Sequence, residues 1–193
     1  MRAAPATPQR WHVFRAAEII RCGGVVAYPT EAVFGLGCDP LNAEAARRLL
    51  ALKRRPASKG LILIAAEFAQ LRPYLGELSD AMRRRIGKTW PGHVTWLLPA
   101  HPELPRWIRG AHSSVAVRVT AHPVAAALCR AADSALISTS ANVAGRAPAR
   151  TTLDVRRQFR DSLDYILPGA TGPFTAPSEI RDGATGKVIR PGG

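Results

Sequence analysis

Short apolar runs constrain the fold of this chain more than any other feature. Residues 25–28 read Val-Val-Ala-Tyr, so a strand built from them has no polar face to turn toward water. A run of this length is typical of a strand rather than a helix, and one that is apolar on both faces lies in a sheet covered on both sides. The same argument predicts further strands at residues 61–65, 94–98, 115–119 and 135–137.

Helical patterns separate these runs. Residues 11–22 carry apolar side chains at helical spacing, and Gly23-Gly24 ends that helix. Asn42 is a predicted N-cap for a helix that runs to Lys53. Further helices are expected after Ser79, from residue 123 to about 131, and from 151 or 152 to about 159. Short strands are expected near residues 165–167, 179–181 and 187–190.

Several predicted strands follow one another with only turns between them. This order predicts a single α/β domain with a twisted, mixed parallel and antiparallel sheet flanked by helices. We assign the domain to residues 11–193 and expect residues 1–10, which are rich in Pro, Ala and Thr, to be a flexible N-terminus. The stretch after Glu31, which contains Gly35 and Gly37, is expected to be a close-packed loop.

The composition narrows the classes of protein that fit. With 47% apolar and 21% charged residues in 193, the chain can bury a core, and its formal charge of +13 suits a surface that meets nucleotides, RNA or other anions. The Arg and Ala bias offers another explanation of that charge, genomic base composition. The three cysteines form no CxxC pair and the five histidines show no metal-ligand spacing, so we expect no protein-held metal. The sequence shows no membrane-spanning run and no signal peptide, which predicts a cytoplasmic protein with no membrane partner.

A basic loop precedes the strand at residues 61–65. Lys53, Arg54, Arg55 and Lys59 fall within seven residues, and Pro56 cannot continue the helix before it. Cations at a helix end and beside a buried strand could hold a nucleotide phosphate. The alternative is a solvated basic turn.

Polar side chains also stand at the ends of predicted strands. Thr30 and Glu31 follow the first strand, and Ser138, Ser140 and Asn142 follow the strand at 135–137, where they could bind a nucleotide or, alternatively, form a cap and turn. Arg118 lies within an apolar strand, and a buried guanidinium needs an anionic partner. That partner is either a ligand or an internal carboxylate such as Asp39 or Glu31.

Taken together, six motifs resemble the YrdC/TsaC family of threonylcarbamoyl-AMP synthases in content and order. They are YPTEAVFGLG (28–37), KRRP with KGL (53–61), WPG (90–92), VAVR (115–118), STSAN (138–142) and PSEI (177–180). The resemblance runs from about residue 11 to 190, and the length is similar to that of the short single-domain bacterial form.

The resemblance implies a nucleotidyltransferase that makes threonylcarbamoyl-adenylate and pyrophosphate from L-threonine, bicarbonate and ATP with Mg²⁺. The product would serve threonylcarbamoyladenosine formation at position 37 of tRNA, so a downstream tRNA threonylcarbamoyl transferase, and tRNA itself, are implied partners. By similarity the catalytic residues are Lys53, Arg55 and Arg118. The implied ATP-binding residues are Lys53, Arg55, Lys59, Ser138, Ser140, Asn142 and Arg190, and the implied threonine-binding residues are Thr30, Arg118 and Ser178.

Three positions depart from the family pattern. Ile64 stands where many members have His, which leaves the details of threonine recognition open. His93 and Thr120 stand where Pro is usual, and we interpret both as loop variation. Two other functions remain alternatives: a double-stranded RNA- or tRNA-binding protein without catalysis, and a related domain of hydrogenase maturation proteins, which usually occurs in larger chains with zinc-finger-like cysteines.

Overall fold

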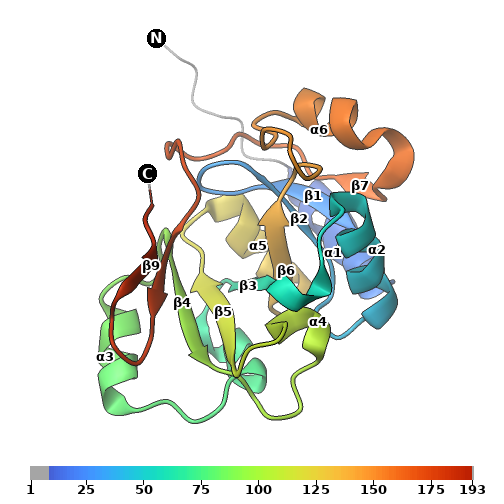
Figure 1. Ribbon diagram of the computed structural model, residues 1–193. Coiled ribbons are helices and arrows are strands. Elements are labelled where there is room, and N and C mark those ends of the chain that lie inside the picture. The colour runs from blue at the N-terminus through green and yellow to red at the C-terminus, as the bar shows by residue number, and fades with distance from the viewer. Residues whose placement is uncertain (1–8, 193) are drawn as a thin grey trace.

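A nine-stranded mixed sheet runs through the molecule (Figure 1). The computed structural model describes residues 9–192, so residues 1–8 of the expected flexible terminus lie outside it, and Arg10 begins the first helix. Across the sheet the strands are β7 (Tyr165–Ile166), β1 (Val26–Pro29), β2 (Phe34–Gly37), β6 (Leu136–Ser140), β3 (Ile62–Ala65), β5 (Ser114–Val119), β4 (Val94–Pro99), β8 (Glu179–Asp182) and β9 (Val188–Arg190).

Parallel and antiparallel pairs alternate irregularly along this order. The pairs β1–β7, β3–β5 and β4–β8 are parallel, and the other neighbours are antiparallel. The predicted mixed α/β sheet is therefore confirmed. β4 and β5 are antiparallel, so β4 begins beside the point where β5 ends, and Gly92 N donates to Val119 O at 2.9 Å there.

One strand was not predicted. Residues 34–37, expected to be a loop, form β2, which pairs with β1 and with β6. Phe34 and Leu36 are fully buried, whereas the glycines make room for the neighbouring strands. A Cβ at Gly37 would lie 2.5 Å from Ile137 O and 2.7 Å from the Tyr28 ring, so only glycine fits. The glycines hid the strand because they remove the apolar alternation by which a strand is recognised.

Helices cover both faces of the sheet. On one face α1 (Arg10–Arg21) packs against α5 (Pro123–Ala132) over β1 and β3. The other face carries α2 (Ala43–Lys53), α3 (Asp80–Gly87), α4 (Arg106–Arg109), α6 (Thr152–Phe159) and the 3₁₀ segments η1 (Ala57–Lys59), η2 (Phe68–Tyr74) and η3 (Arg160–Ser162). The predicted N-caps Asn42 and Ser79 accept from Ala45 N and Met82 N.

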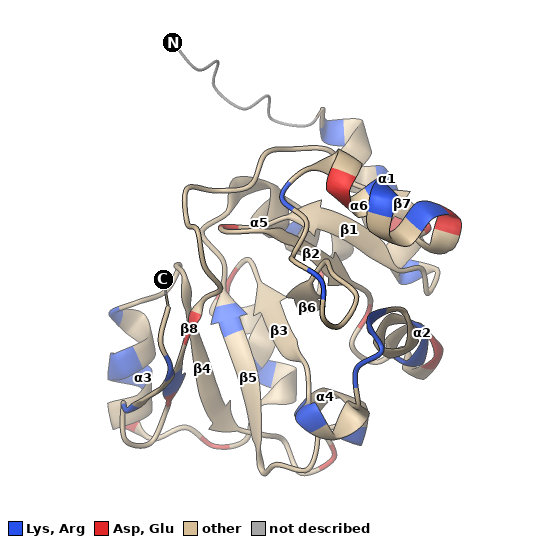
Figure 2. Cartoon of the chain, turned by 45° about the horizontal axis from the view of Figure 1, so that its top comes forward, with Lys and Arg blue, Asp and Glu red and all other residues tan. Residues whose placement is uncertain are grey.

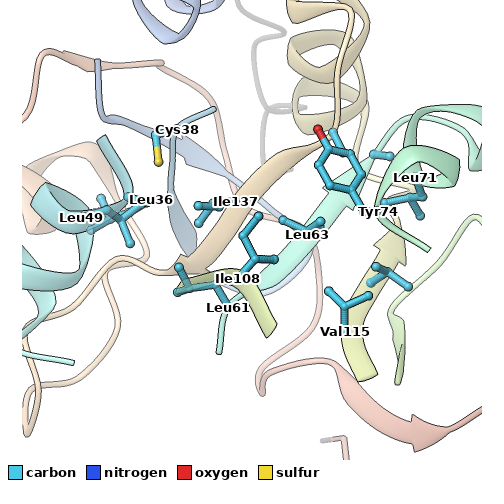
Figure 3. Close-up of a cluster of buried hydrophobic side chains, with 14 of the residues drawn as sticks. Leu36, Cys38, Leu49, Leu61, Leu63, Leu71, Tyr74, Ile108, Val115 and Ile137 are labelled. Carbon is cyan, nitrogen blue, oxygen red and sulfur yellow. The ribbon is translucent and has the colours of Figure 1, made fainter. Parts of the chain in front are cut away.

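Alternation along β3 divides the core into two clusters. Leu63 points into the larger cluster, under α2 and α4, whereas Ile64 points into the cluster formed by α1 and α5. Figure 3 shows the larger cluster, where Leu61 and Leu63 lie among Leu36, Ile108 and Ile137. Because β3 is covered on both faces, its position in the sheet is fixed. The polar residues beside the ends of β3 are therefore also fixed in position.

The positive charge is spread over the molecule. Figure 2 shows Lys and Arg residues along α1, α2, α3, α4 and α6. Within the described residues, no helix is long and apolar enough to cross a membrane.

Candidate functional site

Two adjoining cavities lie where the basic loop meets the ends of β5 and β6. The first, of about 170 Å³, is lined among others by Thr30, Arg55, His93, Arg118, Ser138, Ser140, Ser178 and Arg190. The second, also about 170 Å³, is lined by Lys53, Arg54, Arg55, Pro56, Lys59, Thr139, Ser140, Asn142 and Ala144. Arg55, Thr139 and Ser140 line both, so the two cavities meet at these residues. The structure brings all ten residues expected from the sequence to one cavity or the other.

The lining is strongly cationic. Lys53, Arg54, Arg55 and Lys59 line the second cavity, and Arg55, Arg118 and Arg190 line the first. Among the described lining residues there is no carboxylate, and no cluster of three or more His, Cys, Asp or Glu side chains in the described chain could hold a metal. The combined cavity therefore suits a polyanion, and it offers Mg²⁺ none of the carboxylates that this ion prefers.

Lys53 ends α2 and turns into the protein. Its Nζ donates to Ser140 O, to Asn142 O at 2.9 Å and to Asn142 Oδ1 at 3.3 Å. Burial, together with the neighbouring charge of Arg55, lowers the pKa of Lys53 to about 8. Lys53 thus joins the end of α2 to the end of β6 and the loop after it, and Ser140 at this end of β6 lines both cavities.

Arg55 lies at the junction of the cavities. Its Nη2 donates to Gly60 O at 3.0 Å, while its Nε is buried without a hydrogen-bond partner in the described structure. Burial lowers the pKa of Arg55. A buried N–H that no protein group satisfies is a donor that a bound anion can use. Gly60 shapes this turn with φ 63°, and a Cβ there would lie 2.9 Å from Ile108 O.

The loop after β6 is held by its own side chains. Ser140 Oγ donates to Asn142 Oδ1 at 2.6 Å, and Asn142 Nδ2 donates to Arg146 O at 2.9 Å. The turn structure that was one interpretation of this motif is therefore present. Ser138 is buried and lines the first cavity opposite Gly35, where a Cβ would lie 3.3 Å from Ser138 Oγ. The glycine keeps this wall of the cavity open.

The buried partner of Arg118 is internal. Arg118 Nη1 lies 3.0 Å from Glu31 Oε2, and Glu31 Oε1 accepts from Thr120 Oγ1 at 2.7 Å and from Ala121 N at 3.1 Å. Burial alone would raise the pKa of Glu31, but Arg118 and these donors outweigh burial and lower it. Of the two internal carboxylates considered, the structure selects Glu31 rather than Asp39. Thr120 is therefore part of the network around Arg118, a contact that its interpretation as loop variation did not anticipate.

Thr30, Ser178 and Arg190 complete the first cavity. Thr30 Oγ1 donates to Val33 O at 2.7 Å, which closes the turn between β1 and β2. Ser178 Oγ lies 2.8 Å from Thr95 Oγ1, and Arg190 Nη2 donates to Ser178 O at 2.7 Å. Arg190 therefore reaches the cavity from β9, far along the chain from the basic loop.

His93 was not recognised as a site residue from the sequence. It lines the first cavity, its Nδ1 lies 3.2 Å from Arg118 Nη1, and its Nε2 lies 3.0 Å from Ala176 O. The interpretation of this position as loop variation did not anticipate these contacts. The only sequence signal at this position was a polar residue directly before a strand. That signal points to the site only once it is known that β4 begins beside the end of β5, which carries Arg118.

Ile64 lies away from the cavities. It is fully buried against α5, where Cys129 Sγ contacts Ile64 O at 3.7 Å, and it is not among the lining residues. Ile62, two residues earlier on the same face of β3, lines the first cavity instead.

Known proteins resemble this chain over nearly its whole length. The family Sua5_yciO_yrdC, described as telomere recombination, matches residues 18–192. The threonylcarbamoyl-AMP synthase of Nitrosococcus oceani is 62% identical over 93% of this chain and 97% of the relative, and that of Halorhodospira halophila is 53% identical over 98% of this chain and 100% of the relative. Among solved structures, Sua5 from P. abyssi in complex with L-threonine matches with a TM-score of 0.91 and 32% identity; it covers 97% of this chain, which spans 56% of the P. abyssi chain.

Proposed function

The chain belongs to the Sua5/YciO/YrdC family, and we propose that it is a threonylcarbamoyl-AMP synthase. The observation that carries this proposal is the pair of cavities that meet at Arg55, Thr139 and Ser140. One cavity suits a small carboxylate-bearing substrate and the other suits a triphosphate. A reaction that joins the two substrates would take place where the cavities meet.

The proposed reaction has two steps. The amino group of L-threonine condenses with bicarbonate, water leaves, and a carbamate forms. A carbamate oxygen then attacks the α-phosphorus of ATP, and the bond to the β,γ-pyrophosphate breaks. The products are threonylcarbamoyl-AMP and pyrophosphate. Because charge accumulates on the departing pyrophosphate, catalysis depends on fixed cations near the phosphates rather than on a nucleophile supplied by the protein.

We assign the roles by position in the two cavities. Thr30, Arg118 and Ser178 would bind threonine and its carbamate in the first cavity. Arg55 at the junction would contact the α-phosphate side of ATP, with Lys53 and Lys59 along the triphosphate in the second cavity. Ser138, Ser140, Asn142 and Arg190 would hold the rest of the nucleotide. Lys53 would act on the phosphates by its charge, because the chain's own oxygens already accept its hydrogen bonds.

Mg²⁺ fits this site only as a companion of ATP. Because no carboxylate among the described residues lines the cavities, the phosphate oxygens rather than the protein would be its ligands. Bound in this way, the ion would neutralise phosphate charge.

The product determines the partners. The product is a mixed carbamic–phosphoric anhydride, which is labile in water, so we expect a transferase that acts on tRNA to consume it promptly. We place this sequence of reactions in the cytoplasm, where ATP and tRNA are present. A non-catalytic RNA-binding protein has less support, because it would not need a buried arginine and two joined polar cavities, and because the curated relatives are named as synthases.

Mass spectrometry of the product tests the proposal. The protein is incubated with ATP, ¹³C-bicarbonate and each of a panel of amino acids, including serine and valine. We expect a labelled adenylate and pyrophosphate with threonine, and much less with the others. If no amino acid yields a labelled adenylate, the proposed function is wrong.

A further inference from the structure

His93 connects three parts of the first cavity. It directly precedes β4, and its imidazole contacts Arg118 on β5 and the carbonyl of Ala176 in the segment before β8. Its ring also stacks on Phe174 of that segment, with ring centroids 4.2 Å apart and an interplanar angle of 17°. This one side chain therefore joins segments that are far apart in the sequence.

The contacts define which ring nitrogen carries the proton. A guanidinium only donates hydrogen bonds, so Nδ1 of His93 must accept from Arg118 Nη1. The proton therefore sits on Nε2, which donates to Ala176 O. Both ring nitrogens are thus used by the neutral form.

Glu31 and His93 both contact the same atom of Arg118, Nη1. Nη1 forms an ion pair with Glu31 Oε2 at 3.0 Å, and it donates a hydrogen bond to His93 Nδ1 at 3.2 Å. The ion pair and the directional hydrogen bond together restrict rotation of the guanidinium. The donors left for a ligand are Nη2 and Nε, and Nε is buried without a partner among the described residues.

We propose that His93 is a positioning residue for the amino-acid substrate: it holds Arg118 by Nη1 so that the remaining guanidinium donors face the first cavity. The identity of the ligand rests on the proposed function, whereas the hold on Arg118 does not. Glu31 alone would leave the guanidinium free to swing about a single ion pair. Through Ala176 and Phe174, His93 also fixes the segment that leads to Ser178.

Steady-state kinetics of three variants tests the proposal. His93→Ala removes the acceptor, and we expect it to raise the KM for threonine about tenfold, the loss typical of one hydrogen bond to a charged group, with the KM for ATP changed less than about twofold. His93→Asn places an amide oxygen near the position of Nδ1 and is expected to recover most of the threonine affinity. His112→Ala, which alters an exposed histidine outside the cavities, is the control and should match the wild type.

A second measurement separates this proposal from the proposed function. ¹⁵N NMR of the ligand-free protein should show His93 as the Nε2–H tautomer and a sharp Arg118 guanidinium resonance that broadens in His93→Ala and returns in His93→Asn. If the wild type makes no adenylate but these signals behave as stated, the substrate assignment is wrong and the hold on Arg118 stands. The proposal is overturned if His93 is the Nδ1–H tautomer, or if folded His93→Ala leaves both the Arg118 signal and the KM for threonine unchanged.

Discussion

Arg118 Nη1 and Glu31 Oε2 form an ion pair, 3.0 Å apart, whose side chains are only 7% and 6% exposed. Glu31 belongs to the turn after β1 and Arg118 to β5, so the pair connects two strands that are not neighbours in the sheet. Taking two charges out of water is costly, and the hydrogen bonds from Thr120 and Ala121 to Glu31 offset part of that cost. The pair thereby holds Arg118, which lines the first cavity.

Breaking this pair from one side should destabilise the fold. Glu31→Gln keeps the shape but leaves Arg118 buried without a counter-ion, and we expect the free energy of unfolding in urea to fall by about 3–5 kcal/mol. Glu31→Gln combined with Arg118→Met removes both charges and should be more stable than Glu31→Gln alone. A single variant within about 1 kcal/mol of the wild type would show that the pair contributes little.

Much of the fold follows from the sequence because its strands are short and apolar. β1, β3 and β5 are recognisable from their runs, and Asn42 and Ser79 mark helix starts that the structure confirms. β2 is different: Gly35 and Gly37 are there because neighbouring strands approach closely, and that approach exists only in the folded sheet.

The candidate site, like the fold, could be predicted from the sequence only in part. Ten side chains could be named from strand ends and from the family resemblance, but their partners could not. Arg118 could have paired with a ligand, Asp39 or Glu31, and only the folded structure shows that the partner is Glu31. His93 was missed because its contact with Arg118 depends on the antiparallel pairing of β4 with β5, and Thr120 was missed because its partner Glu31 comes from a distant part of the chain.

Because Ile64 is buried away from the cavities, a substitution there should change the stability of the protein without changing its affinity for threonine. Ile64→Val removes one buried methylene group and should lower the free energy of unfolding by about 0.5–1.5 kcal/mol. Because Ile64 lies outside the cavity lining, the KM for threonine should stay unchanged. Ile62→Val makes the same change at a residue that lines the first cavity, and it should raise that KM more than Ile64→Val does. Thermal unfolding and kinetics on the two variants make the comparison, and a larger KM effect from Ile64→Val would contradict the assigned cavity.

The basic loop is expected to act through charge. Lys53→Met and Arg55→Ala should each reduce threonine-dependent pyrophosphate release by about 100-fold or more, a loss comparable to removing one transition-state donor. Arg47→Ala, which removes an exposed cation from the same helix as Lys53, is the matched control and should retain full activity. Circular dichroism checks that the variants are folded. Normal turnover in folded Lys53→Met and Arg55→Ala would exclude the loop from catalysis.

The titration of Lys53 predicts an alkaline limit to activity. Burial and the charge of Arg55 lower its pKa to about 8, so the ammonium form is lost as the pH rises through that value. Above it, kcat/KM for ATP should fall about tenfold per pH unit, because a neutral amine cannot balance phosphate charge. The protein should stay folded over this range. Between about pH 8 and the ordinary lysine pKa of about 10.4, Lys53 is protonated in the unfolded chain but largely neutral in the folded protein. The titration of Lys53 therefore increases the free energy of unfolding as the pH rises.

Measurements of kcat/KM for ATP at saturating threonine and bicarbonate isolate this loss of activity at alkaline pH. Lys53→Arg keeps a cation that stays protonated throughout the range, so a variant with reduced activity but a flatter alkaline profile is expected. A wild-type profile that is flat between about pH 7 and 9.5 would contradict the predicted alkaline loss of activity. The same alkaline loss in Lys53→Arg would assign the titration to another group.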